Sequence, residues 1–186
     1  MVDSTILISS ELSEQQKIDE QWMQHAYEQA AFAASQGEIP VGAIIVSQGN
    51  VIGQGFNAPI LLNDPTAHAE IQAIRQACSH IQNYRLPDDA TLYVTLEPCT
   101  MCVGALIHSR IHRVVFGATE PKAGSLVSSR KLLELGYYNH VFEFEGGCLH
   151  AQCSAQLSDF FRMRREQKKQ HRVEQNLLKK QNNNLE

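Results

Sequence analysis

Apolar positions along the chain alternate between helical and extended spacing. Between Ser13 and Gly37 they recur at steps of three and four residues, and Ser13 with Gln16 forms a capping-box sequence. This pattern predicts a helix that begins after Ser13 and ends at Gly37. Its apolar members are Ile18, Trp22, Met23, Ala26, Tyr27 and Ala30. We interpret this stripe, Trp22 included, as a face that packs into a core.

Short runs rich in β-branched and aromatic residues predict the strands of a sheet. They cover Val41–Val46, Val51–Phe56, Thr91–Leu96, Arg113–Ala118 and Val141–Glu145. Helices are expected between and after them. These cover 65–81, 98–109, 127–135 and a last helix from about Ala151. The order predicts a three-layer α/β/α sandwich around a mixed sheet of about five strands.

Three candidate metal ligands begin two of these predicted helices. His68 follows Asp64-Pro65, which indicates a helix N-cap and first position, and Cys99 and Cys102 follow Pro98 three residues apart. One imidazole and two thiols favour zinc over harder cations, and three protein ligands leave a fourth tetrahedral position for water. The pattern predicts an open, catalytic zinc site.

Structural zinc clips and redox sites also use Cys-x-x-Cys. A structural zinc site usually has four protein ligands, and no fourth His or Cys is locally spaced to complete one here. His80, His108 and His112 are more simply surface or loop histidines. The open site is therefore the preferred interpretation.

Glu70 lies two residues after His68 and is the candidate proton carrier. Zinc lowers the pKa of its bound water to about 7, and a carboxylate can then move protons to the substrate. On an ideal helix the two positions point about 200° apart, so Glu70 has to reach around with its side chain. We expect this conformation of Glu70 only because the reaction needs a proton carrier, since the spacing does not predict it.

His-x-Glu together with Pro-Cys-x-x-Cys is the signature of zinc-dependent nucleobase deaminases. Beyond this signature the sequence resembles the bacterial tRNA-specific adenosine deaminases, over about Gln21 to Gln167. The stretches that carry the likeness are Glu38–Ala43, Asn63–Glu70, Thr91–Cys99 and Leu157–Arg165. The resemblance implies a cytidine-deaminase-like fold, one zinc ion per subunit and a homodimer.

The resemblance also implies the reaction. It is the hydrolytic conversion of adenosine to inosine at the wobble position (34) of the arginine tRNA with anticodon ACG. A hydroxide activated by zinc attacks C6, Glu70 shuttles protons, and ammonia leaves. The anticodon stem-loop would be the partner, with neither DNA nor a membrane expected.

Substrate contacts are implied at positions that match the family. These are Asn57, Ala69, Glu120, Lys122, Phe160, Arg162, Arg164 and Arg165. Asn57 near a turn could equally satisfy local backbone, but family members use the matching Asn to hold the target nucleotide. Family members usually have Asp where Glu120 stands, followed by a longer glycine-containing run, so this loop departs from the family pattern.

The net charge of −4 argues mildly against nucleic-acid binding, so RNA contacts have to come from a local patch. Such a run lies at the end of the last helix: Arg162, Arg164, Arg165, Lys168, Lys169 and Arg172, against Glu166 alone. It could be a solvated helix terminus or a phosphate-contacting arm. The residues alone do not choose between these, whereas the resemblance favours RNA.

Two other functions use the same features. A deaminase of free guanine or cytosine would share the zinc ligands, although His68, Asn57 and the 160–165 segment favour RNA. A catalytically silent RNA-binding or scaffolding module is the other alternative, against which the intact Glu70 and ligand set argue.

The remaining features indicate a cytoplasmic protein with a single domain. Cys78, Cys148 and Cys153 are interpreted as free thiols of a reducing compartment, and no apolar run or basic leader suggests a membrane span or signal peptide. We expect a flexible N-terminus over 1–12, the deaminase domain over 13–172 and a disordered tail over 173–186, whose final Leu-Glu could be non-native.

Overall fold

A computed structural model describes residues 12–183, and their side chains up to residue 175. A five-stranded mixed sheet in the order β2-β1-β3-β4-β5 forms its centre. The strands are β1 (Gly42–Ser47), β2 (Asn50–Phe56), β3 (Thr91–Leu96), β4 (Arg113–Ala118) and β5 (Glu143–Gly146). β1 pairs antiparallel with β2 and β3, while β3, β4 and β5 run parallel. The predicted mixed sheet of about five strands is confirmed.

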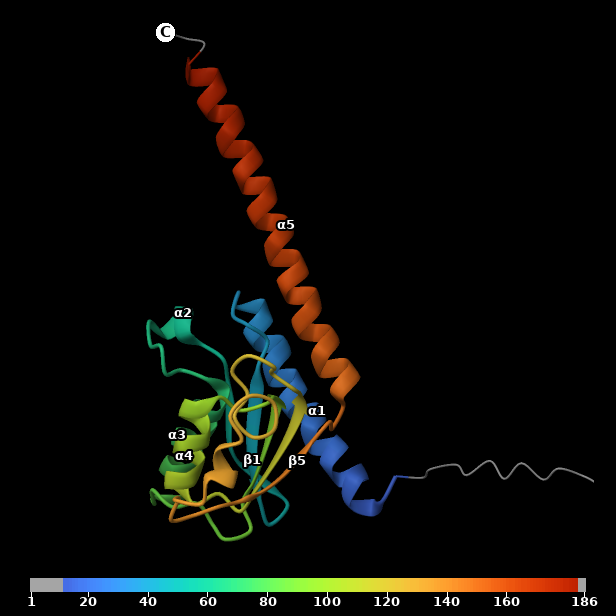
Figure 1. The fold of residues 1–186 in the computed structure, drawn as a ribbon, viewed down its shortest axis with the longest axis vertical. Coiled ribbons are helices and arrows are strands. Elements are labelled where there is room, and N and C mark those ends of the chain that lie inside the picture. Colours follow the sequence, from blue (N-terminus) through green and yellow to red (C-terminus); the bar gives the residue numbers. More distant parts are fainter. Residues whose placement is uncertain (1–11, 184–186) are drawn as a thin grey trace, which may run out of the picture.

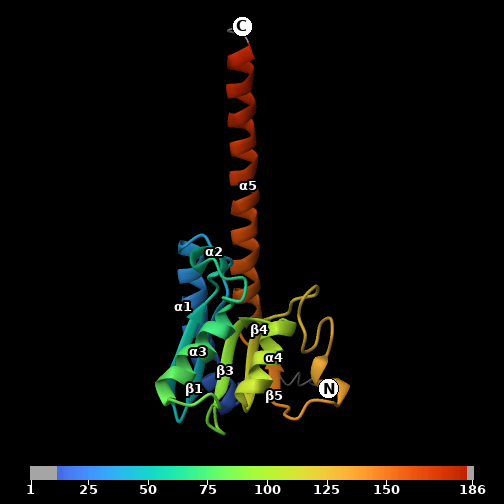
Figure 2. The same ribbon diagram turned by 90° about the vertical axis from the view of Figure 1, so that its left-hand side faces the viewer.

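Helices cover both faces of the sheet, as predicted (Figure 1, Figure 2). One face packs against α3 (Ala69–Ile81) and α4 (Thr100–Ser109), and the other against α1 (Glu14–Ser35) and the first turns of α5 (His150–Asn183). The Ser13 capping box is present, with the Ser13 hydroxyl and the Gln16 side chain each accepting the other's backbone N–H. These helices enclose a separate apolar cluster on each face of the sheet.

The start of α3 differs from the prediction. The helix begins at Ala69, with His68 in extended conformation as its N-cap residue, and not at Pro65. The Asp64 carboxylate accepts hydrogen bonds from the Thr66 N–H and hydroxyl, which fixes a local turn instead of capping a helix. Asp64 therefore acts as a turn residue, one of the two roles that its side chain favours.

Two smaller differences lie in the connections. A four-residue helix, α2 (Pro59–Leu62), was not predicted, and the expected helix over 127–135 is only a 3-10 turn, η1 (Leu132–Leu135), ending at Gly136. The Glu97 carboxylate accepts the backbone N–H groups at 126–128. This holds the first part of the segment as a loop.

The last helix is longer than predicted. α5 continues to Asn183, so residues 173–183 are helical where the sequence suggested a disordered tail. This part of the chain has no Gly or Pro and contains two Gln, two Leu and two Lys, which have good helix propensity. Residues 1–11 and 184–186 lie outside the described residues, so the expectations for the N-terminus and the final Leu-Glu are not examined by the structure.

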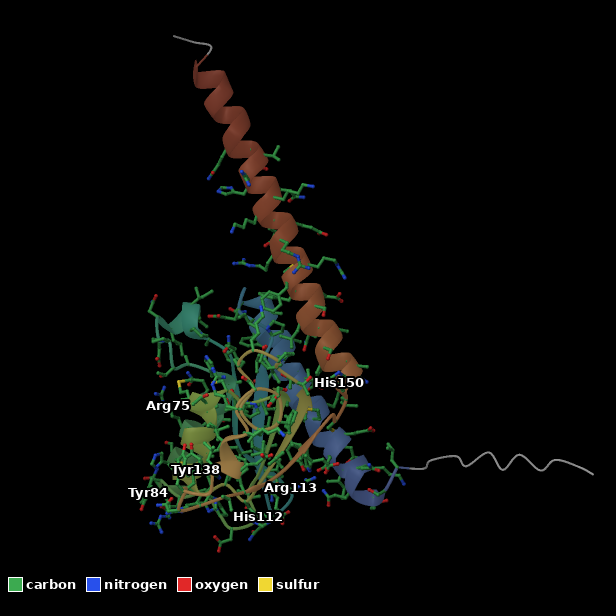
Figure 3. All side chains as sticks on the ribbon, in the orientation of Figure 1. Arg75, Tyr84, His112, Arg113, Tyr138 and His150 are labelled. Carbon is green, nitrogen blue, oxygen red and sulfur yellow. The ribbon has the colours of Figure 1, made fainter. Side chains whose placement is uncertain are left out.

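A buried ionic cluster joins α1 to the sheet. Arg113 donates to both carboxylate oxygens of Asp19, at 2.8 and 2.7 Å, and to Glu145 at 2.9 Å, while the Tyr93 hydroxyl donates to Asp19 at 2.9 Å. Figure 3 shows Arg113 at the end of the body opposite α2. The cluster therefore connects α1, β3, β4 and β5 at the amino-terminal end of β4.

Within the described residues, no helix combines the length and apolar composition that crossing a membrane requires.

Candidate metal centre and deaminase site

The three predicted ligands meet where two helices begin. His68 is the N-cap residue of α3 and Cys99 is the N-cap residue of α4, directly after β3 and Glu97-Pro98. The Sγ atoms of Cys99 and Cys102 are 3.7 Å apart, and His68 Nδ1 lies 3.7 Å from Cys99 Sγ and 3.6 Å from Cys102 Sγ. The three ligand atoms form a nearly equilateral triangle.

This triangle fits a tetrahedral zinc ion. Zinc lies about 2.3 Å from thiolate sulfur and about 2.0–2.1 Å from imidazole nitrogen, so tetrahedral angles separate two sulfurs by roughly 3.8 Å and sulfur from nitrogen by roughly 3.6 Å. The observed spacings agree with both values. His68, Cys99 and Cys102 could therefore hold one metal ion together, with one coordination position left for a non-protein ligand.

Hydrogen bonds among the three candidate ligands favour a thiolate at Cys99. Neither N-cap residue caps its own helix with its side chain, so His68 and Cys99 are free to face each other. A hydrogen bond with Cys102 and one with His68 lower the pKa of Cys99 to about 4. The hydrogen bond with Cys99 and burial raise the pKa of Cys102, and the bond with Cys99 raises that of His68. The ligand set thus holds at least one thiolate, the form that binds metal.

The Glu70 side chain lies beside the candidate metal ligands, as the proton-carrier role requires. It lies in the first turn of α3 and is 4% exposed, and its carboxyl is close enough to the Cys99 and Cys102 thiols for each group to influence the other's pKa. Burial raises the pKa of this carboxyl. Because His68 is the extended N-cap residue, the 200° separation of an ideal helix does not apply to the pair. A buried carboxyl with a raised pKa beside the ligands is suited to carrying protons.

Close contact with the sheet fixes the start of α3. Gly53 and Gly55 of β2 face this helix, and a Cβ at Gly55 would overlap the Ala69 carbonyl oxygen and the Ala73 nitrogen. Ala69, Ala73 and Ala77 are fully buried on the facing side. Small residues on both elements therefore let α3 approach the sheet closely enough to bring Glu70 to the ligands.

A second buried carboxylate, Glu97, fixes the loop that follows β4. One of its oxygens accepts the backbone N–H groups of Leu126, Val127 and Ser128, at 3.1, 2.8 and 3.0 Å. The other oxygen accepts the Glu120 N–H at 3.1 Å and the Ser128 hydroxyl. Glu97 belongs to no motif that predicts this role, and its only signal in the sequence is its position directly after a buried strand. It ties the 120–128 loop to the turn that carries Cys99.

Glu38 is a third buried carboxylate near the site, and like Glu97 it accepts backbone N–H groups of a distant segment. This carboxylate is 2% exposed and accepts the N–H groups of Ile60 and Leu61 at 2.8 and 2.7 Å, which anchors α2. The Ala58 N–H donates to the Ala67 carbonyl at 2.9 Å. The segment containing Asn57 is thereby paired with the residue before His68.

The structure places the predicted substrate-contacting residues in two groups. Asn57 and Ala69 are buried, Ala69 directly after His68 and Asn57 directly before Ala58, which pairs with Ala67. Glu120 and Lys122 lie in the loop held by Glu97, where the Glu120 carboxylate accepts the Lys122 N–H. The rest are on α5. Phe160 is 6% exposed and packs into the body, so Phe161, 42% exposed, presents the accessible ring there.

The basic residues of α5 point into solvent. Arg162, Arg164 and Arg165 are exposed, and Arg162 pairs with Asp159 at 2.7 Å. The structure therefore brings the three candidate zinc ligands together, with Glu70 and Ala69 at the start of the helix that His68 caps. Asn57 precedes Ala58, which pairs with Ala67, and Glu120 lies on the adjoining loop. The structure leaves the arginines on a separate helix.

Comparison with known proteins identifies the family. A family model described as MafB19-like deaminase matches residues 18–165. The tRNA-specific adenosine deaminase of Haemophilus influenzae (strain ATCC 51907 / DSM 11121 / KW20 / Rd) is 51% identical over 164 residues, 88% of this chain and 92% of that protein. Both matches include every proposed zinc ligand and Glu70 within a continuous region.

Solved structures agree with this similarity. One, from a study of A-to-I editing by tRNA:A34 deaminases at the wobble position, has a TM-score of 0.71 and 39% identity, covering 74% of this chain and 99% of that chain. The guanine deaminase of Bacillus subtilis has a TM-score of 0.53 and 34% identity, covering 68% of this chain and 83% of that chain. The cytidine-deaminase-like fold that the sequence predicted is confirmed. The chain belongs to the MafB19-like deaminases and, among them, to the family of the tRNA-specific adenosine deaminases.

Proposed function

We propose that this protein hydrolyses adenosine to inosine at the wobble position (34) of tRNA, with the arginine tRNA bearing anticodon ACG as its substrate. The observation that carries the proposal is the buried Glu70 carboxyl beside the His68–Cys99–Cys102 triangle. The substrate is supported by the similarity to the Haemophilus protein and to the solved tRNA:A34 deaminase.

One zinc ion per subunit is the proposed cofactor, held by His68, Cys99 and Cys102. When bound there, zinc would lower the pKa of a water molecule to about 7 and so supply hydroxide as the nucleophile. The spacing of the three ligand atoms supports this metal.

Glu70 moves the protons of the reaction. It accepts a proton from the attacking water and delivers it to N1 of adenine as the oxygen adds to C6. It then carries the second proton to the amine, so the C6–N bond breaks and ammonia leaves. The raised pKa supports both roles, because it makes the carboxylate a better proton acceptor than an ordinary Glu and favours the protonated form that delivers the proton. Water and adenosine are thereby converted to inosine and ammonia.

An anticodon loop suits this site on energetic grounds. Its bases are largely unpaired, so turning one into a pocket costs only unstacking, a few kcal/mol at most. Asn57, buried beside the ligand turn, is the proposed contact to the target nucleotide. We also propose a homodimer and a cytoplasmic location, on the family resemblance.

Deamination of a free base is the second candidate, since the Bacillus guanine deaminase shares the fold at 34% identity. The identity of 51% to the Haemophilus tRNA-specific enzyme over nearly all of its length favours tRNA instead.

A substrate panel decides between them. The protein, loaded with zinc, is incubated with unmodified arginine tRNA bearing ACG and, in parallel, with free adenosine, cytosine and guanine. We expect inosine at position 34 and no turnover of the free compounds. Turnover of a free base with unchanged tRNA would assign the protein to the small-molecule deaminases.

A further inference from the structure

The terminal helix leaves the body beside the catalytic edge of the sheet. Ser154, Leu157 and Phe161 of α5 line one groove with Leu96, Ala118, Thr119 and Glu120, which are the ends of β3 and β4 and the start of the loop held by Glu97. Beyond this groove the helix extends past the end of the body where α2 lies, in both views (Figure 1, Figure 2). Every residue from Phe161 to Gln175 is exposed.

The packed face of α5 continues outward as a row of positive charge. Leu157, Phe161, Arg164, Lys168 and Arg172 follow one another at steps of three and four residues, which is one face of a helix. We call Arg164, Lys168 and Arg172 the basic stripe. Phe161, Arg164 and Lys168 also border one shallow hollow on the surface of the helix. The basic stripe therefore lies on the same face of α5 as the residues that line the groove beside Glu120.

Charge is concentrated in this part of the chain. Residues 162–172 hold six of the sixteen Lys and Arg but one of the twenty Asp and Glu, so they carry +5 while the rest of the chain carries −9. Lys168 lies four residues from both Arg164 and Arg172, and like charges at this spacing destabilise a helix. In Figure 3 nitrogen-tipped side chains stand out from this part of α5 into solvent. An anionic partner would relieve the repulsion.

The composition excludes a coiled coil with a second copy along this segment. Between Arg164 and Arg172 the sequence has no apolar residue, so no seam of a and d positions exists for another helix to bury. A row of exposed cations suits phosphates instead. Phe161 and Arg172 are eleven residues apart, about 16 Å along the helix axis.

We propose that the basic stripe binds the phosphate backbone of the double-stranded stem next to the loop that enters the active site. The proposal rests on the proposed function and adds a stem contact beyond residue 165, where the match to the family model ends. Duplex RNA is recognised mainly through its shape and its phosphate and sugar groups, so the contact would add affinity without reading sequence.

The test compares single-charge changes on two sides of α5 in the full chain. Lys168→Gln and Arg172→Gln each remove one positive charge from the stripe. Gln170→Glu is the matched control, because it changes the net charge by the same amount but lies about 200° around the helix from both residues. Wobble deamination is measured on an anticodon hairpin with its complete stem and on one with a stem shortened to two base pairs. For the complete stem we expect KM to rise roughly three- to tenfold with each stripe variant and kcat to stay unchanged. Gln170→Glu, and all variants on the short stem, should change little.

Direct binding of the complete hairpin is measured in parallel at several salt concentrations. Each stripe variant should lower the salt dependence of log Kd by about one phosphate contact, and Gln170→Glu should not. Equal weakening by Lys168→Gln and Gln170→Glu, or weakening by neither, would overturn the proposal, while inosine formation by the wild type would keep the proposed function. If the wild type formed no inosine, the proposed function would be wrong. The binding measurements alone would then test whether the basic stripe contacts the phosphates of the stem.

Discussion

At the scale of single residues, spacing alone was enough to predict which three candidate ligands come together. A Cys-x-x-Cys that follows a strand and a His that precedes a helix predicted that the three side chains would meet at one point. The structure places their ligand atoms 3.6–3.7 Å apart. The position of Glu70 needed the fold, because its reach depends on His68 standing outside the helix. Glu38 and Glu97 had no motif to indicate them, since their partners are backbone N–H groups distant in sequence.

Replacement of a ligand should remove the metal. Cys99→Ser replaces a thiolate whose pKa lies near 4 with a hydroxyl that stays protonated at neutral pH and is a poor zinc ligand. We expect the purified variant to hold much less than one zinc per chain by elemental analysis. Cys78→Ser, which changes a thiol outside the ligand triangle, should keep the wild-type zinc content. Full zinc content in Cys99→Ser would contradict the assignment of this ligand.

At the scale of elements, local patterns predicted best where no distant contact competed with them. Thr91–Leu96 and Arg113–Ala118 lie where predicted, and Ser13 caps α1 through its own capping box. The start of α3 was predicted wrongly because Asp64 can cap a helix or form a turn, and the chain uses it for the turn. The 127–135 segment was predicted wrongly because Glu97, distant in sequence, takes its N–H groups.

The close packing of α3 on β2 can be tested with one methyl group. Gly55→Ala places a Cβ against the backbone of Ala69 and Ala73, so α3 has to shift, and we expect a loss of about 1–3 kcal/mol in the free energy of unfolding. Gly104→Ala in α4 is the matched control, because its Cβ would meet open space and Ala favours helix. Chemical denaturation measures both. Equal stability of Gly55→Ala and the wild type would show that the helix does not depend on this contact.

At the scale of the whole molecule, a single ionic cluster connects elements from distant parts of the sequence. Asp19 lies on α1, Arg113 begins β4 and Glu145 lies on β5. No local pattern links these positions, so sequence reasoning could not pair them. The direction of α5 beyond the body was likewise not predictable, because it follows from how the first turns of the helix pack on the sheet.

The cluster should make stability depend on pH. Burial alone would raise the pKa of Asp19, but hydrogen bonds from Arg113, Tyr93 and Gln15 and the charge of Arg113 hold it below its ordinary value of 3.8. The folded state therefore binds this proton less readily than the unfolded state. The resulting stabilisation is complete above about pH 5 and is lost as the pH falls below 3.8 through the lowered pKa.

Asp19→Asn isolates this contribution. We expect the variant to be less stable than the wild type by about 1.5–3 kcal/mol at pH 7, because Arg113 loses its charged acceptor. The difference should shrink as the pH falls below 4, which urea denaturation at a series of pH values can follow. A difference that stayed constant from pH 7 to pH 3 would mean that the charge of Asp19 has no part in it.

The measurement that tests the proposed chemistry most directly is turnover of a zinc-loaded Glu70→Ala variant on the ACG tRNA hairpin. We predict one zinc per chain and a deamination rate lower by about 10²–10⁴-fold, because the ligands remain but the proton carrier is gone. Glu28→Ala, which removes an exposed carboxylate on α1, should keep the wild-type rate. Near-wild-type turnover of Glu70→Ala with full zinc content would contradict the role of Glu70 and with it the proposed mechanism.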